Sequence, residues 1–374
     1  MGRQLQQLID AGQSIWLDNI ERSMFASGEL RRLIDSGLRG MTSNPTIFEK
    51  AIGGGHDYDA QIESLAGKVR DLNQLFEALA IQDIRAALDE FRPLYDETGG
   101  GDGFVSLEVS PLLAHDTQGT IAAARRLWKE VDRPNLMIKI PGTEEGGPAI
   151  TEAIAAGINV NVTLLFSLEG YEHASNAYIA GLEKRASAGQ ALDRIASVAS
   201  FFLSRIDTEV DKQLEAKIAA GRKELEPLLG KAAIAQAKLA YGRFEEIFWS
   251  ERFKKLEAKG ARVPRPLWAS TSTKNPLYPD LLYVETLVGP HTVNTLPPKT
   301  LAALVDHGKI AAGTVKTDLA GTHETLEDLE KAGISLGDIT DALTVAGVKS
   351  FADSYDMMLE AIATKKKQFA GAGA

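Results

Sequence analysis

Short apolar segments alternate with helical segments along almost the whole chain, and this alternation constrains the possible fold more than any other feature. Strands that alternate with helices form parallel sheets, and eight such units predict a closed (β/α)8 TIM barrel. The expected strands are residues 14–20, 38–43, 104–109, 136–140, 158–164, 196–201, 266–272 and 292–296.

Helical patterns fill the intervals between these strands, and we expect the 374 residues to form a single barrel domain. A doubly wound open sheet is the alternative, but no Gly-x-Gly-x-x-Gly motif follows the first strand and no Walker-type loop occurs. We expect a helical insertion at 206–259 and a frayed, solvated tail at 365–374 that contains three lysines. The other expected helices are 4–11, 29–35, 57–65, 72–91, 117–131, 147–156, 168–184, 281–288, 298–307, 323–331 and 335–364.

Lys139 lies inside the otherwise apolar strand 136–140. A desolvated ammonium group loses several kcal/mol of hydration unless another group pairs with it. Burial favours the neutral amine, which is a nucleophile toward carbonyl groups. Taken alone, the pattern also fits a lysine that reaches solvent from a strand end or pairs with a carboxylate.

Composition excludes several classes of function. The net charge of -10 argues against nucleic acid or an anionic membrane as a partner. The chain has no cysteine, so it can form no disulfide and no thiolate metal site, which suits the cytoplasm. We expect no signal peptide and no membrane span, because the N-terminus is polar and no apolar stretch approaches ~20 residues. The six histidines are scattered, so we expect no metal site.

Polar residues recur on one parity of four expected strands. Side chains in a barrel strand alternate between the interior and the helices, and active sites lie at the carboxyl ends of the strands. The apolar residues occupy the helix-facing parity in each of these strands. The inward parity therefore brings together Asp18, Glu108, Lys139, Asn161 and Thr163. A lysine with two carboxylates and a hydroxyl can perform Schiff-base chemistry on a carbonyl.

These residues belong to segments that together resemble the transaldolases. Each match is short, but the matches follow one another in the order of the family and each lies at a strand end. The segments are WLD at 16–18, GMTSNPT at 40–46, VSLEVS at 105–110, IKIP at 138–141, NVNVTLLFS at 159–167, SFFLSRI at 200–206 and ASTSTKN at 269–275. The resemblance implies transfer of a dihydroxyacetone unit from a ketose phosphate to an aldose phosphate, without a cofactor. It also implies sugar phosphates as the small-molecule partners and a homodimer as the assembly.

The resemblance assigns a role to each matched position. Lys139 would form the Schiff base, Glu108 and Thr163 would move protons through a water, and Asp18 would take the proton from the C4 hydroxyl. The expected substrate-binding residues are Asn44, Asn161, Ser200, Phe201, Arg205 and Lys274. Arg205 and Lys274 would contact the phosphate, although many relatives carry arginine at the position of Lys274.

Two other functions stay open. A fructose 6-phosphate aldolase shares the lysine chemistry but releases free dihydroxyacetone. Relatives of that type are shorter and carry tyrosine at the position of Phe201, which favours transfer. The chain could also be an inactive barrel that serves as a scaffold. However, it retains Lys139, Asp18, Glu108 and Thr163.

Overall fold

The computed structural model describes residues 2–371 and confirms the predicted barrel. The strands form one closed parallel sheet in sequence order, and β1 pairs with both β2 and β8. The strands are β1 (Gln13–Asp18), β2 (Gly40–Thr42), β3 (Phe104–Glu108), β4 (Leu136–Pro141), β5 (Val160–Leu165), β6 (Ser197–Phe202), β7 (Arg265–Ala269) and β8 (Thr292–Leu296).

Helices surround this sheet and connect its strands. They are α1 (Arg3–Asp10), α2 (Arg22–Ala26), α3 (Glu29–Ser36), α4 (Pro45–Gly53), α5 (Asp59–Ala66), α6 (Leu72–Glu97), α7 (Thr117–Val131), α8 (Gly146–Ala155), α9 (Leu168–Ser187), α10 (Ser204–Ala219), α11 (Ala232–Phe248), α12 (Glu251–Glu257), α13 (Leu282–Glu285), α14 (Pro298–His307), α15 (Leu319–Lys331) and α16 (Leu336–Gly371). Three short 3-10 helices, η1 (Pro111–Leu113), η2 (Lys223–Leu228) and η3 (Thr314–Lys316), complete the connections. In the part of the chain that the structure describes, no helix is both long enough and apolar enough to pass through a bilayer.

Trp16 of β1 is fully buried, with the Phe104 ring and the Arg265 guanidinium beside it. Its indole ring lies over Gly40 on the neighbouring strand, where a built Cβ would come within 2.6 Å of the ring. Gly40 is therefore required by the close approach of the ring, and β2 keeps a residue that is unfavourable within a strand. At the amino-terminal end of the barrel, Asp102 accepts hydrogen bonds from Ser14 and from the guanidinium groups of Arg39 and Arg265. These contacts close that end of the barrel.

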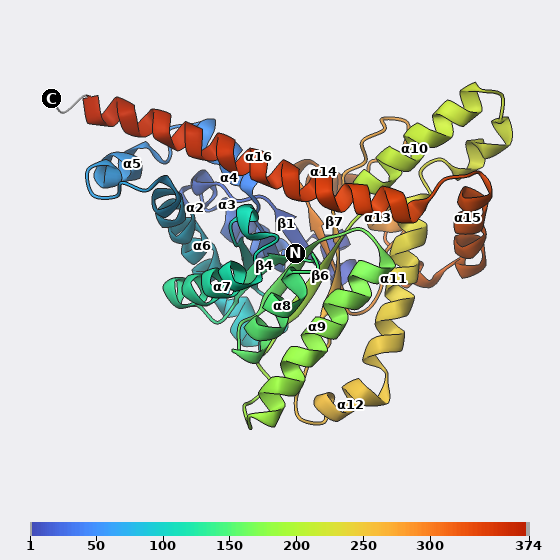
Figure 1. The fold of residues 1–374 in the computed structure, drawn as a ribbon, viewed down its shortest axis with the longest axis horizontal. Helices are drawn as coiled ribbons and strands as arrows, with labels where there is room; N and C mark the ends of the chain where they lie inside the picture. Colours follow the sequence, from blue (N-terminus) through green and yellow to red (C-terminus); the bar gives the residue numbers. More distant parts are fainter. Residues whose placement is uncertain (1, 372–374) are drawn as a thin grey trace.

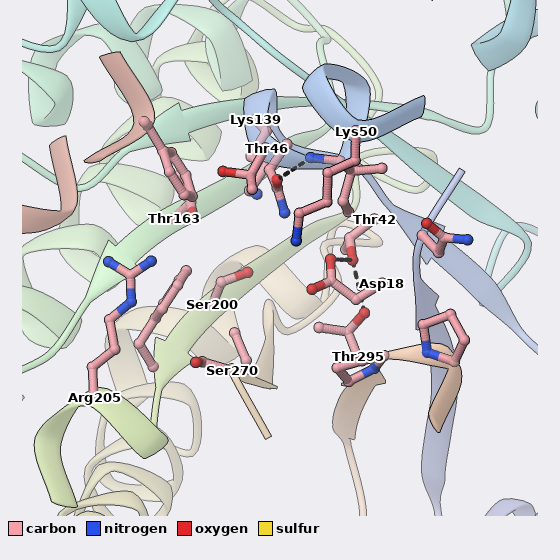
Figure 2. Close-up of a pocket in the computed structure, with 18 of the residues that line it drawn as sticks. Asp18, Thr42, Thr46, Lys50, Lys139, Thr163, Ser200, Arg205, Ser270 and Thr295 are labelled. Carbon is pink, nitrogen blue, oxygen red and sulfur yellow. Dashed lines mark hydrogen bonds between the residues drawn. The ribbon is translucent and has the colours of Figure 1, made fainter. Parts of the chain in front are cut away.

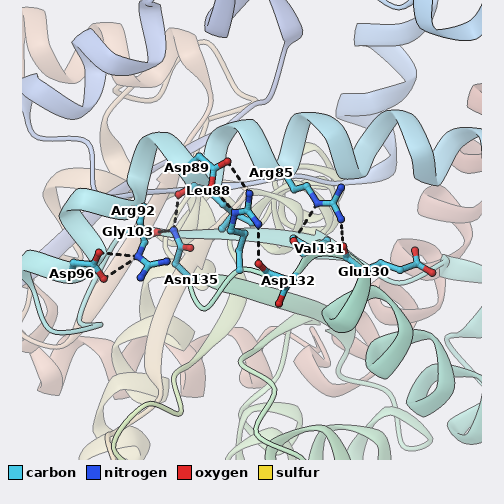
Figure 3. Close-up of polar contacts among 11 residues, drawn as sticks. Arg85, Leu88, Asp89, Arg92, Asp96, Gly103, Glu130, Val131, Asp132 and Asn135 are labelled. Atoms are coloured by element: carbon cyan, nitrogen blue, oxygen red, sulfur yellow. Dashed lines mark hydrogen bonds and ion pairs between the residues drawn. The ribbon is translucent and has the colours of Figure 1, made fainter. Parts of the chain in front are cut away.

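Polar contacts hold α6 against the loops that lead into β3 and β4 (Figure 3). Asn135 is fully buried, and its side-chain amide donates to the carbonyls of Leu88 and Gly103, each at 2.9 Å. Arg133 pairs with Asp89 of α6 at 2.5 Å. Asn135 immediately precedes β4, so this network fixes the start of the strand that carries Lys139.

The predicted insertion contains three α-helices, α10, α11 and α12, together with η2. α11 packs against α9, α10 and α15 on the outside of the barrel, and its residue Phe244 lies within 5.5 Å of Phe248, ring centre to ring centre. The segment therefore has its own apolar contacts and forms a continuous layer with the helices beside it (Figure 1).

The prediction of a frayed tail is wrong for residues 365–371. α16 continues to Gly371 and crosses one end of the molecule from beside α15 to α5 (Figure 1). Two of the three lysines in this region, Lys365 and Lys366, contact the rest of the protein. Lys365 pairs with Asp59 at 2.5 Å and Lys366 donates to the Val69 carbonyl at 2.6 Å. Residues 372–374 of the predicted tail lie outside the described residues.

Other differences have simple local causes. α4 was not predicted, although Asn44 caps it by accepting a hydrogen bond from the Ile47 amide and Pro45 occupies its first turn. The short helix α2 was also not predicted. α6 passes through Pro93 and ends six residues beyond the predicted limit of residue 91, because Tyr95 is buried against Phe104. Tertiary packing here outweighs the cost of a proline within a helix.

Candidate functional site

A cavity of about 390 Å³ opens at the carboxyl ends of the strands (Figure 2). It contains seven of the predicted site residues, which come from six strands or from the segments that follow them. These are Asp18, Asn44, Lys139, Thr163, Ser200, Arg205 and Lys274. This is the end of a TIM barrel at which active sites are built.

Lys139 lies on β4 and its side chain is 5% exposed. Its ammonium group donates to the Ser43 carbonyl at 3.1 Å and lies 3.2 Å from the Glu108 carboxylate. β3 and β4 place Glu108 and Lys139 in direct register, which explains the contact. The Phe351 ring of α16 lies 5.5 Å from the same ammonium nitrogen, measured to its centre. Lys139 is therefore paired and partly enclosed, yet it lines the cavity.

Glu108 and Thr163 lie on either side of Lys139. The Glu108 side chain is 4% exposed, and apart from the Lys139 ammonium neither its oxygens nor the Thr163 hydroxyl has a polar partner among the described residues. Burial raises the pKa of Glu108 and the neighbouring Lys139 charge partly opposes this rise. A carboxyl group with a raised pKa can both take and give a proton near neutral pH.

Asp18 ends β1 and faces Lys139 across the cavity. The Thr42 hydroxyl donates to its Oδ1 at 2.7 Å and is itself 2.7 Å from the Thr295 hydroxyl (Figure 2). Burial raises the pKa of Asp18, while the charge of Lys139 and the Thr42 hydrogen bond oppose the rise. One carboxylate oxygen is held by Thr42, which orients the other.

Asn161 and Ser200 form a chain of hydrogen bonds. Asn161 is fully buried and donates from Nδ2 to the Ser106 hydroxyl at 2.9 Å, and its Oδ1 accepts from the Ser200 hydroxyl at 2.7 Å. Ser200 lines the cavity, whereas Asn161 lies behind it. Asn44 lines the cavity too, but its Oδ1 already caps α4, so only its amide nitrogen is free to bind a ligand.

Cationic side chains cover one side of the cavity. Arg205 comes from the first turn of α10 and Lys274 from the loop after β7, and neither forms an ion pair with any of the described residues. Desolvation lowers the pKa of Lys274, and the nearby charges of Arg205 and Lys50 lower it further. Desolvation also lowers the pKa of Arg205. Because unpaired cations destabilise each other, this side of the cavity favours an anion such as a phosphate group.

The prediction for Phe201 is wrong. Phe201 is fully buried on the helix-facing side of β6, where its ring packs edge-on against Trp268 with the ring centres 6.5 Å apart. Phe202 lines the cavity instead, and the Arg205 guanidinium lies 5.6 Å from the centre of its ring. The parity rule would have found this, since Ser200 points inward and residues two apart share a face.

Sequence analysis also missed cavity residues on helices, among them Lys50 and Phe351. Lys50 extends from α4 into the cavity (Figure 2), and Phe351 comes from α16, more than 200 residues beyond Lys139. The helix cap formed by Asn44 and Pro45 would have placed Thr46 and Lys50 on one face of α4. No local signal marks Phe351, because only the packing of α16 across the barrel brings it to the site.

The arrangement suits imine chemistry. An amine nucleophile lies 3.2 Å from one buried carboxyl group, a second carboxyl group faces it, and cations stand ready for an anionic substituent of the substrate. Among residues 2–371 no group of three or more His, Asp or Glu side chains is arranged to hold a metal ion.

Known proteins resemble the chain over nearly its full length. Residues 15–362 match the family model described as Transaldolase/Fructose-6-phosphate aldolase. A transaldolase from Thermobifida fusca is 50% identical over 364 residues, which cover 97% of this chain and 98% of the relative. One from Acidothermus cellulolyticus is 51% identical, covering 96% and 95%. One from Trichodesmium erythraeum is 47% identical, covering 97% and 98%.

Proposed function

This chain belongs to the Transaldolase/Fructose-6-phosphate aldolase family, and from that premise we propose how its cavity performs transaldolase chemistry. The unit transferred is dihydroxyacetone, which passes from a ketose phosphate to an aldose phosphate. The observation that carries the proposal is the position of Lys139, which reaches a cavity lined by Asp18 and by Arg205 and Lys274, two cations that form no ion pair within residues 2–371.

Formation of the imine is the first step. Lys139 attacks the C2 carbonyl of the ketose, and loss of water from the resulting carbinolamine requires a proton to reach the departing hydroxyl group. Glu108 supplies that proton through a water bound to its carboxyl group and to the Thr163 hydroxyl. The support for this role is that both groups are buried beside Lys139 without another hydrogen-bond partner among the described residues.

Cleavage of the C3–C4 bond follows. Asp18 accepts the proton of the C4 hydroxyl, the bonding electrons move into the protonated imine, and an aldose phosphate leaves. The raised pKa of Asp18 makes its carboxylate a stronger base than an exposed aspartate, and Thr42 holds it in position. The enamine left on Lys139 then attacks the acceptor aldehyde by the reverse steps, and hydrolysis of the new imine releases the product.

Substrate recognition uses the remaining lining residues. Arg205 and Lys274 bind the phosphate, Ser200 and the Asn44 amide bind the sugar hydroxyls, and Asn161 orients Ser200. Phe202 is placed beside Arg205 and covers the apolar side of the sugar. Binding the phosphate at a distance from Lys139 holds the reacting carbonyl in place, which lowers the entropic cost of reaction.

The same premise supports three broader proposals. The whole chain acts as one catalytic unit, since the family match runs from residue 15 to residue 362. We also propose a homodimer and a cytoplasmic location, both on the resemblance to the named transaldolases. Sedimentation of the purified protein and fractionation of cells test these two proposals.

Borohydride trapping tests the mechanism. The protein is reduced in the presence of fructose 6-phosphate, and its intact mass and peptides are then analysed. We expect a reduced dihydroxyacetone adduct on Lys139 that is lost in Lys139→Met and kept in Lys50→Met, which changes another lysine of the same cavity. An adduct on a different lysine, or none on the folded protein, would refute the assignment and favour a scaffold function.

A further inference from the structure

Arg205 and Lys274 belong to separate segments of the chain. If both bind one phosphate group, contacts between the two segments must fix the distance between the two side chains. Arg205 is fixed by the first turn of α10, but Lys274 lies in an irregular loop between β7 and α13 that has neither a helix nor a strand. Near the barrel the two segments meet at a hydrogen bond of 2.8 Å between the hydroxyls of Ser204 and Ser270. That contact precedes Lys274 by four residues, and the next residue, Thr271, donates to the Thr295 carbonyl at 2.9 Å, three residues before Lys274.

A second attachment lies beyond Lys274. Asp211 of α10 is 6% exposed, and its Oδ2 accepts a hydrogen bond from the Tyr278 hydroxyl at 2.7 Å. One turn earlier on the same helix, Asp207 is 2% exposed and accepts from the Tyr283 hydroxyl at 2.6 Å. Both tyrosines follow Lys274 in the chain, so the two aspartates tie the far side of the loop to the helix that carries Arg205.

The segment after α10 completes the coordination of these carboxylates. The amide of Gly230 donates to Asp211 and the amide of Ala233 donates to Asp207, at 2.9 and 2.8 Å. Gly230 has a positive φ of 69°, and a Cβ built on it would lie 2.8 Å from the Tyr278 ring. The glycine therefore permits both the turn and the close approach of the tyrosine.

Neither aspartate forms an ion pair with a described residue, although burying a carboxyl group is costly. They also line a second cavity, which shares Lys274 with the substrate cavity. Within residues 2–371 the only partners of these buried acids are two tyrosines and two amides, and such a pair does little for stability that an apolar pair could not do. What they provide is a directional link between the loop and the helix.

We propose that Asp211, acting through Tyr278, is a positioning residue for phosphate recognition, and that the turn at Gly230 exists to hold it. The proposal rests on the proposed function, because it assumes that Arg205 and Lys274 bind the substrate phosphate. It also gives the start of the helical segment between β6 and β7 a purpose: the segment fixes the distance between these two cations. Loss of the link should weaken phosphate binding and leave the lysine chemistry intact.

The test compares Tyr278→Phe and Asp211→Asn with Tyr178→Phe. Tyr178 is a matched control, because its hydroxyl also donates one hydrogen bond, to the Arg262 carbonyl at 2.8 Å, at a site that is not part of the cavity. For each protein, kcat/KM is measured with glyceraldehyde 3-phosphate and with unphosphorylated glyceraldehyde as acceptor. Inorganic phosphate is titrated separately to obtain its dissociation constant.

We expect the ratio of the two kcat/KM values to fall about tenfold in both test variants, with a matching weakening of phosphate binding, and to stay at the wild-type value in Tyr178→Phe. Equal losses with both acceptors, or no change in the ratio and in phosphate binding, would overturn the proposal. Borohydride trapping with unphosphorylated dihydroxyacetone distinguishes a failure of the proposed function from a failure of the positioning role of Asp211. If the wild type gives no adduct on Lys139 the proposed function fails, and the phosphate titration still decides whether the link positions the cations.

Discussion

Lys139 and Glu108 form a buried ion pair, and a double-mutant cycle measures how much their interaction contributes to the free energy of unfolding. Lys139→Met and Glu108→Gln each remove one charge at nearly constant volume, and the double variant removes both. Each single variant leaves one charged or polar group buried, since the two side chains are only 5% and 4% exposed. The double variant leaves neither charge, so it should be more stable than the sum of the single changes predicts.

The expected size follows from the geometry. At 3.2 Å, two unit charges in a medium with an effective dielectric constant of 20 attract one another by about 5 kcal/mol. Removing one partner of a buried pair typically costs about 3–5 kcal/mol. We therefore expect each single variant to lose about 3–5 kcal/mol in the free energy of unfolding, with a coupling energy of about 3 kcal/mol or more.

Urea unfolding of the four proteins measures this coupling. The surface pair Arg92–Asp96, at 2.8 Å but about half exposed, is the control, and its coupling should be below about 1 kcal/mol. Additive losses at Lys139 and Glu108, within about 0.5 kcal/mol, would refute the argument.

The Lys139→Met variant has a second, pH-dependent signature. Burial raises the pKa of Glu108 above its ordinary 4.5, and the charge of Lys139 is the largest of the effects that lower it. Without Lys139 the folded state prefers the protonated acid more strongly, so the variant loses stability relative to the wild type as the pH rises through the raised pKa of Glu108 in the folded wild type. A deficit that instead shrinks with rising pH would contradict this explanation.

Four further substitutions test other parts of the structure. Asp18→Asn should still form the trapped adduct but release no aldose phosphate from fructose 6-phosphate, and normal turnover would remove Asp18 from its role. Gly40→Ala should cost about 1–3 kcal/mol in urea unfolding, because its Cβ would lie 2.6 Å from the Trp16 ring. Gly242→Ala, with no atom within 4 Å, should be neutral or stabilising. Burial raises the pKa of Asp207 from 3.8 to about 6. The free energy of unfolding of the wild type should therefore fall by about 3 kcal/mol as the pH rises from 3.8 to 6. Asp207→Asn should abolish that loss. An unchanged pH dependence in Asp207→Asn would contradict the shift.

The alternation of side chains along the strands predicts the barrel and several of its site residues. The inward positions of β3, β4 and β5 were assigned from the alternation of apolar residues, and the observed register places Glu108, Lys139 and Asn161 side by side. The rule works because a strand buried on both faces can carry polar groups only where the barrel interior accommodates them.

The missing parts depend on contacts between distant segments. Phe202 could have been found by extending the same parity, but Phe351 reaches Lys139 only because α16 crosses the barrel. The tail was mistaken for a solvated end because three consecutive lysines have no local partner. The partners of Lys365 and Lys366, among them Asp59, lie about 300 residues earlier in the sequence.

The pairing of β1 with β8 means that the barrel cannot close until most of the chain has been synthesised. β1 emerges about 270 residues before β8, which at 5–20 residues per second corresponds to roughly 15–50 s. Throughout that interval the nascent sheet has two free edges, and such edges can pair with other chains. The ribosome-bound chain should therefore need protection by chaperones until β8 has been made, even though the finished sheet has no edge at all.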